Sequence, residues 1–185
     1  MTINPPGWAR TREAVSDSVV LGLACLVTWL LVTEVLARIP GVSSADHLLG
    51  AMWAVLATIF VNRATVAESD TAAVSRLAAT LISFVYCLVY LSLAPFHTWA
   101  LPVLVAASAL TAMLLGRPED AITAAITTTV VLVVAAVSPH DAWLQPILRF
   151  ADTVVGTAVG VGSAWLYLRA IKPGMERALG HGGHR

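Results

Sequence analysis

The apolar stretch 146–168 contains residues whose types and spacing could support chemistry. Four of them recur every three or four positions: Arg149, Asp152, Gly156 and Gly160. A helix places them on a single face. Each ion costs roughly 2.5–3.5 kcal/mol at the centre of a membrane helix unless its side chain faces protein or water. The stretch therefore predicts either a site that handles anions and protons or a local ion pair, beside a glycine pair that lets another backbone approach closely.

A second apolar stretch, 74–94, repeats part of this pattern 73 residues earlier. Arg76 and Thr80 stand at the same offset as Arg149 and Thr153. Arginine binds carboxylates through two parallel hydrogen bonds and stays charged at any working pH. These four residues are therefore candidates for binding an anionic substrate. For Arg76 the alternative is a side chain that extends to the lipid headgroups.

The other equivalent positions carry mostly small residues. The pairs are Ala79 with Asp152, Ser83 with Gly156, and Cys87 with Gly160. Small residues at these places predict close helix packing. Asp152 lacks an acidic counterpart, and it could either carry a proton that couples transport to the membrane gradient or neutralise Arg149.

The composition is that of an integral membrane protein. Of the 185 residues, 58% are hydrophobic and 12% are charged, and the mean hydropathy is +0.81. A soluble domain has about 25% charged residues. The zero formal net charge provides no basic surface for nucleic acid. We expect a protein surrounded by membrane lipid, without cofactor, metal site or enzymatic activity, because no metal-binding, phosphate-binding or catalytic grouping occurs.

The hydrophobic pattern predicts an all-α protein with six membrane-spanning helices in one module, 17–170. A cytoplasmic N-terminal segment, 1–16, precedes the module, and a cytoplasmic tail, 171–185, follows it. Residues 63–75 are expected to form a polar connector. The six expected helices cover residues 17–38, 47–62, 74–94, 99–115, 120–138 and 146–168.

The distribution of basic residues predicts the topology. An even number of spans, six, places both termini on the same side of the membrane. Nine of the eleven Lys and Arg residues lie on that side, and Arg38 and Arg149 lie on the other. The positive-inside rule then places both termini in the cytoplasm. Because three crossings reverse the chain direction, the 73-residue repeat relates two inverted three-helix units, as in many secondary transporters. Arg76 and Arg149 then lie near opposite faces of the membrane, where they could attract an anion along a shared aqueous route.

Glu34 is a second candidate for proton coupling, since it is an acid near the end of the first expected helix. Arg38 follows one turn later, so the alternative is an ion pair between these two residues at the membrane interface.

Three segments resemble the fusaric acid resistance, or aromatic acid exporter, family over about residues 48–168. They are 51–66 (AMWAVLATIFVNRATV), Arg76-x-x-x-Thr80 and Arg149-x-x-Asp152-Thr153-x-x-Gly156. The resemblance implies a plasma-membrane protein that exports aromatic or other organic carboxylates. It also implies distant kinship with the dimeric, aluminium-activated malate channels of plants.

The chain departs from this family pattern in two ways. Ala79 stands where glycine is common, and a single six-helix module is present where longer members have a second module and a soluble domain. Association into a homodimer is therefore expected. The first function expected is export of organic anions; the alternatives are a passive anion channel and a membrane scaffold or regulatory subunit that transports nothing.

Overall fold

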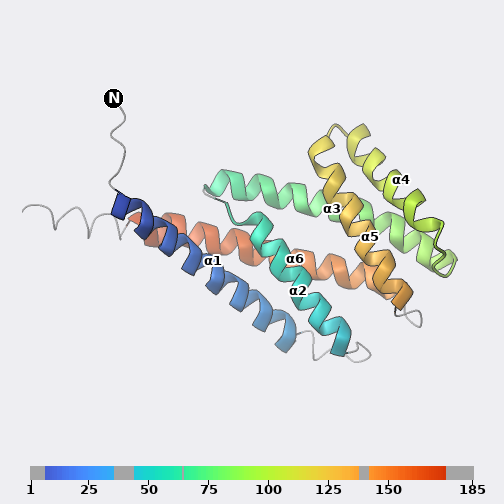
Figure 1. Cartoon of the computed structure of the whole chain (residues 1–185), viewed down its shortest axis with the longest axis horizontal. Helices are drawn as coiled ribbons and strands as arrows, with labels where there is room; N and C mark the ends of the chain where they lie inside the picture. Colours follow the sequence, from blue (N-terminus) through green and yellow to red (C-terminus); the bar gives the residue numbers. More distant parts are fainter. Residues whose placement is uncertain (1–6, 36–43, 64, 138–141, 174–185) are drawn as a thin grey trace, which may run out of the picture.

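The structure is a computed structural model of the chain, and it describes residues 7–35, 44–63, 65–137 and 142–173. All regular structure in these residues is helical, which confirms the expected all-α class (Figure 1). The helices are α1 (Gly7–Val35), α2 (Ser44–Val61), α3 (Val66–Leu93), α4 (Ala100–Leu114), α5 (Ala121–Val137) and α6 (Leu144–Leu166). A short 3-10 helix of one turn, η2 (Pro118–Asp120), precedes α5, and a π-helical turn, η4 (Tyr167–Ile171), follows α6.

Among the described residues, four helical segments are long and apolar enough to cross a membrane: Ala14–Glu34, Val66–Leu93, Pro118–Val137 and Leu144–Ala170. Two more apolar helices are shorter, Asp46–Val61 and Ala100–Leu114. With a rise of about 1.5 Å per residue, 15 residues extend roughly 22 Å, less than the ~30 Å of a hydrocarbon core. Length thus supports four of the six expected spans directly.

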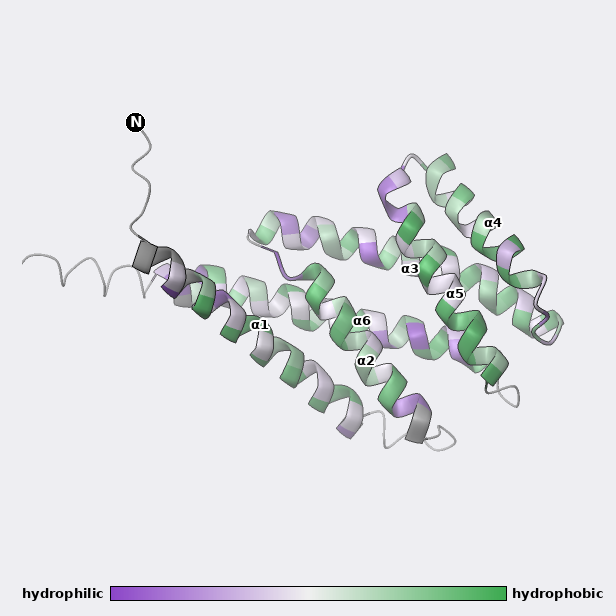
Figure 2. Cartoon of the chain, in the orientation of Figure 1, coloured by the Kyte–Doolittle hydropathy of each residue, from purple (hydrophilic) through white to green (hydrophobic). Residues whose placement is uncertain are grey.

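Two helices begin well before their expected starts. α1 begins at Gly7 and not at residue 17, and α3 begins at Val66 and not at residue 74. The early start of α3 has a local cause, because the Thr65 hydroxyl accepts a hydrogen bond of 3.2 Å from the backbone N–H of Glu68. Most of the connector expected at 63–75 is therefore helix, and Figure 2 shows that this first part of α3 is hydrophilic.

Helices α2 and α6 run parallel and in close contact. A Cβ atom added at Gly156 would overlap the backbone carbonyl of Ala54, and one added at Gly160 would lie 3.0 Å from the carbonyl oxygen of Thr58. The glycine pair therefore brings two helix backbones together. The partner of this pair is α2, and α3 also contacts α6.

Buried hydroxyl groups connect each side of the bundle. On one side, Thr28 of α1 lies 2.8 Å from the hydroxyl of Thr58, which also donates a 2.9 Å bond to the Gly156 carbonyl. On the other side, the Thr128 hydroxyl of α5 is bonded to Ser108 of α4, at 3.0 Å, and to Ser83 of α3, at 3.1 Å. Each side therefore contains three helices joined through one hydroxyl of the middle helix.

Helices α3 and α5 also run parallel, and α3 lies against α6 in the centre of the molecule (Figure 1). Cys87 of α3 packs with Val131 and Leu132 of α5 in the larger apolar cluster. Phe84 of α3 stacks against Phe150 of α6, with ring centroids 5.3 Å apart. The two arginine-bearing helices are therefore neighbours.

The Gly156 contact predicts a large effect of one methyl group. We expect Gly156→Ala to destabilise the protein by roughly 1–3 kcal/mol or more, because the new Cβ meets backbone that cannot rotate away. Thermal unfolding in detergent micelles measures this effect. The matched control is Gly162→Ala on the same helix, where a Cβ meets nothing within 4 Å; equal destabilisation of both variants would contradict the prediction.

Candidate functional site

Arg76 places its guanidinium group between two aromatic rings of α2. The guanidinium carbon lies 5.2 Å from the ring centroid of Trp53 and 5.0 Å from that of Phe60. Arg76 is 6% exposed, and its Nε atom has no hydrogen-bond partner. Within the described part of the chain it forms no ion pair either. Since cation–π contacts contribute only roughly 0.5–2 kcal/mol, Arg76 is a buried cation whose charge is incompletely compensated.

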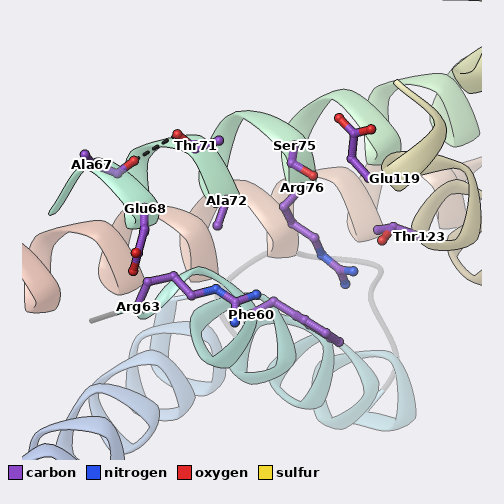
Figure 3. Close-up of a pocket in the computed structure, with 10 residues that line it drawn as sticks. All are labelled: Phe60, Arg63, Ala67, Glu68, Thr71, Ala72, Ser75, Arg76, Glu119 and Thr123. Atoms are coloured by element: carbon purple, nitrogen blue, oxygen red, sulfur yellow. Dashed lines mark hydrogen bonds between the residues drawn. The ribbon is translucent and has the colours of Figure 1, made fainter. Parts of the chain in front are cut away.

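Arg76 lines a cavity of about 800 Å³ where α2 ends and α3 and α5 begin (Figure 3). The cavity contains a second arginine, Arg63, whose side chain extends toward Phe60 in Figure 3. Its two acids, Glu68 and Glu119, are both exposed. The other lining residues are small or carry hydroxyl groups: Ala67, Thr71, Ala72, Ser75 and Thr123. The cavity thus combines a buried guanidinium, unpaired among the described residues, with a volume large enough for a small organic molecule.

No acid follows Arg76 one helical turn later, and within the described residues neither acid of the cavity, Glu68 or Glu119, forms an ion pair with it. Arg149 has Asp152 one turn later on the same helix, whereas the equivalent position after Arg76 is Ala79, which is fully buried. A helix brings side chains at positions i and i+3 together. Three residues after the arginine, α6 therefore carries a carboxylate and α3 carries an alanine.

Arg149 lies in a cluster where its charge is matched. Its Nη1 atom pairs with Oδ2 of Asp152 at 3.2 Å, and its Nη2 atom donates to the backbone carbonyl of Asp46 at 3.4 Å. The Asp46 carboxylate is also close enough to interact electrostatically with Arg149, and its Oδ1 atom accepts a 3.0 Å bond from Gln145. Arg149 is 2% exposed and is not among the residues that line the Arg76 cavity. Its geometry corresponds to the local ion pair considered as the alternative.

Asp152 is fully buried against α2. A Cβ atom at Gly50 would lie 2.9 Å from Oδ1 and 3.0 Å from Oδ2 of its carboxylate. The glycine therefore provides the space into which the carboxylate fits. The sequence repeat did not indicate Gly50, because its role depends on the register of two helices far apart in the chain.

The two candidate threonines donate their hydroxyl protons within their own helices. Thr80 donates to the backbone carbonyl of Arg76 and Thr153 to that of Arg149, both at 2.8 Å. Both side chains are buried. An anion needs donors, and each of these protons is already engaged.

A second buried carboxylate lies at the cavity end of the bundle. Asp120, which is fully buried, pairs with Nε of Arg117 at 2.5 Å and accepts a hydrogen bond from the Ser75 hydroxyl. The sequence places Asp120 at the start of a helix, where an acid complements the helix dipole. Its additional partners come from a tight turn around Gly116, whose φ of 74° favours glycine, and from α3.

The other proton-coupling candidate, Glu34, is an exposed residue near the end of α1. Its expected partner, Arg38, lies outside the described residues. Among the described residues, no group of three His, Cys, Asp or Glu side chains is arranged to hold a metal ion.

Comparison with known proteins identifies the family. The family model described as fusaric acid resistance protein-like matches residues 23–162, well over half of the chain. A search of curated proteins found no match, and a search of solved structures found none. Together with the long apolar helices, the family match indicates a multi-pass membrane protein. The chain belongs to the fusaric acid resistance protein-like family.

Proposed function

We propose that this protein moves organic carboxylate anions, in particular aromatic ones, out of the cell across the plasma membrane. The family match supports a membrane transport function of the exporter type. The observation that carries the choice of an anion is Arg76, a buried guanidinium without a counter-ion that lines an open cavity. A substrate carboxylate would provide the charge-assisted, bidentate hydrogen bonds that the described residues do not provide.

The surroundings of Arg76 also favour an aromatic substrate. Trp53 and Phe60 hold the guanidinium through their ring faces. Phe60 is half exposed and lines the cavity, so part of its ring remains available for stacking. Offset stacking of aromatic rings adds roughly 0.5–1.5 kcal/mol beyond the burial of area.

The contacts between helices support two inverted three-helix repeats, α1–α3 and α4–α6, as the framework of this proposal. Ala54 of α2 and Gly156 of α6 are in contact. The 73-residue offset relates Ala54 to position 127 in α5 and Gly156 to position 83 in α3, so an inverted repeat predicts a contact between positions 127 and 83. The bond observed there joins Thr128 to Ser83, a difference of one residue. In this framework α2 and α4 also cross the membrane, and the bilayer adapts to their short length.

The topology and assembly that we propose follow from the distribution of charge and the size of the chain. Both termini lie in the cytoplasm, so the Arg76 cavity, near the starts of α3 and α5, opens toward the cytoplasm. Six helices leave little room for a complete path, so two copies associate as a homodimer. Glu34 has no part in the path, because it lies exposed near the far end of α1.

Within this proposal the two arginines have different tasks. Arg76 attracts the substrate, and Arg149 with Asp152 forms an ion pair that holds α6 in place. Thr80 and Thr153 are minor contributors, since their hydroxyl protons are bonded to backbone.

Arg76→Ala is expected to lower the flux of benzoate in proteoliposomes at least about tenfold, because hydrogen bonds to charged groups contribute roughly 1.5–3 kcal/mol. Arg76→Lys should retain part of the flux, since it keeps the charge but loses the bidentate geometry. The matched control is Arg169→Ala, which removes an exposed arginine that also lies over a tryptophan, Trp165, at 5.6 Å. If the unmodified protein gives no more benzoate flux than empty liposomes, the result favours the membrane scaffold that transports nothing. If Arg76→Ala leaves the flux unchanged, Arg76 is not part of the path.

Arg149→Met is expected to destabilise the protein by roughly 3–5 kcal/mol, because it leaves the Asp152 carboxylate buried without a partner. The double variant Arg149→Met with Asp152→Leu should recover most of this loss, since a pair of apolar residues needs no compensation. Thermal unfolding of the single and double variants in the same detergent measures the difference. A double variant as unstable as the single one would contradict the assignment of an ion pair.

The same double variant separates the transport mechanisms. If the pair is structural, benzoate flux in the double variant should depend on a pH gradient to the same extent as in the unmodified protein. Loss of that dependence would instead assign proton coupling to Asp152. If the unmodified protein carries benzoate equally well with and without a proton gradient, and so does Asp152→Asn, the passive channel is the better description.

A further inference from the structure

A crevice separate from the Arg76 cavity runs between α1 and α6. Its polar compartment, of about 310 Å³, lies at the end of the bundle where α1 begins and α2 and α6 end. Its apolar compartment, of about 390 Å³, follows further along the same two helices. The two compartments share Val20 and Tyr167 in their linings, so they adjoin each other, and we name them together the α1–α6 crevice.

The polar compartment has an excess of positive charge. Arg63 and Lys172 provide two cations, and Asp17 provides one carboxylate. No ion pair of these three residues occurs within the described part of the chain. Asn62 adds an amide whose one side-chain bond among the described residues, to Ser163, is long at 3.4 Å. These groups suit a phosphate, which needs cations and N–H donors.

The apolar compartment is lined almost entirely by hydrocarbon. Leu23 and Val27 of α1 form one wall, and Val159 and Leu166 of α6 form the other. Gly162 leaves the floor open, since a Cβ atom there would meet nothing within 4 Å. The walls are joined at the polar end, where the hydroxyls of Ser16 and Tyr167 lie 2.6 Å apart.

The order of the two compartments follows the order of groups in a phospholipid. From Asp17 to Val27 the lining of α1 changes from charged to apolar over about 15 Å of helix, inward from the end of the bundle. A cationic compartment at the interface above an apolar groove therefore matches a phosphate headgroup joined to acyl chains. Arg169 and Trp165, which lie on the same end of α6 and η4, are residue types typical of that interface.

We propose that the α1–α6 crevice binds one anionic glycerophospholipid, with its phosphate at Arg63 and Lys172 and an acyl chain along Gly162. The charge balance favours an anionic lipid over a zwitterionic one, because Asp17 neutralises only one of the two cations. The adjoining apolar compartment favours a lipid over free phosphate, which could use only the polar compartment.

The test counts lipids retained by the full-length protein in native mass spectrometry, with phosphatidylglycerol and phosphatidylcholine of identical acyl chains. The unmodified protein should retain one phosphatidylglycerol at concentrations where phosphatidylcholine is lost. Arg63→Ala with Lys172→Ala should weaken phosphatidylglycerol binding roughly tenfold or more, and Asp17→Asn should strengthen it, because each changes the charge that faces the headgroup. Gly162→Leu should also weaken it, since the new side chain enters the groove from a position where a Cβ atom meets nothing within 4 Å.

Arg169→Ala is the matched control, because it removes a cation at the same end of the bundle that does not line the crevice. The proposal is overturned if this variant loses as much lipid as the double variant, or if phosphatidylcholine is retained equally. Displacement of the lipid by glycerol 3-phosphate at similar concentration would identify a site for free phosphate. If Gly162→Leu converts dimers to monomers and leaves lipid retention unchanged, the groove holds a second copy of the chain and not a lipid.

Discussion

The backbone contact between α2 and α6 is the constraint on which the rest of the structure depends. At Gly156 the two helices lie so close that no side chain of any size fits between them. This approach places Gly50 over the Asp152 carboxylate and the Asp46 carbonyl within reach of Arg149. The same helix, α2, turns its aromatic residues toward α3 and Arg76. One close contact thus fixes the surroundings of both arginines.

Equivalent positions in a repeat need not have equivalent chemistry. Arg76 and Arg149 occupy equivalent positions in the repeat, both are buried, and both face α2. In the low dielectric of a membrane protein, however, the energy of a cation is decided by its nearest partner. A carboxylate one turn away makes Arg149 part of the scaffold, whereas Ala79 leaves Arg76 with only the faces of two rings. In the function proposed above, this difference of one residue in the repeat separates a structural arginine from one available to a ligand.

Much of the fold could be predicted from the sequence, because hydrophobic spans and their order are local properties. The all-α class, the family and the two arginines all followed from such patterns. What could not be predicted depends on contacts distant in sequence: the place of Phe60 beside Arg76, and the fit of Asp152 on Gly50. The start of α3 is a different case, since Thr65 and Glu68 have the spacing of a capping box and could have indicated it. The expectation that both arginines face one aqueous space stays a prediction; in the structure Arg149 pairs with Asp152 and does not line the Arg76 cavity.

Arg63 is shared by two of the sites described above, since it lines both the Arg76 cavity and the polar compartment of the α1–α6 crevice. It follows the last turn of α2, where the helix dipole favours a cation, and it is exposed, so its long side chain can turn to either side. A phosphate in the crevice draws this charge toward α1 and away from the Arg76 cavity. The Arg76 cavity then has one positive charge fewer nearby, so the electrostatic potential that attracts an anion to Arg76 is lower. Under the two proposals made above, occupancy of the lipid site and affinity for the anion are coupled through a single side chain, and by linkage an anion held at Arg76 and Arg63 weakens lipid binding in turn.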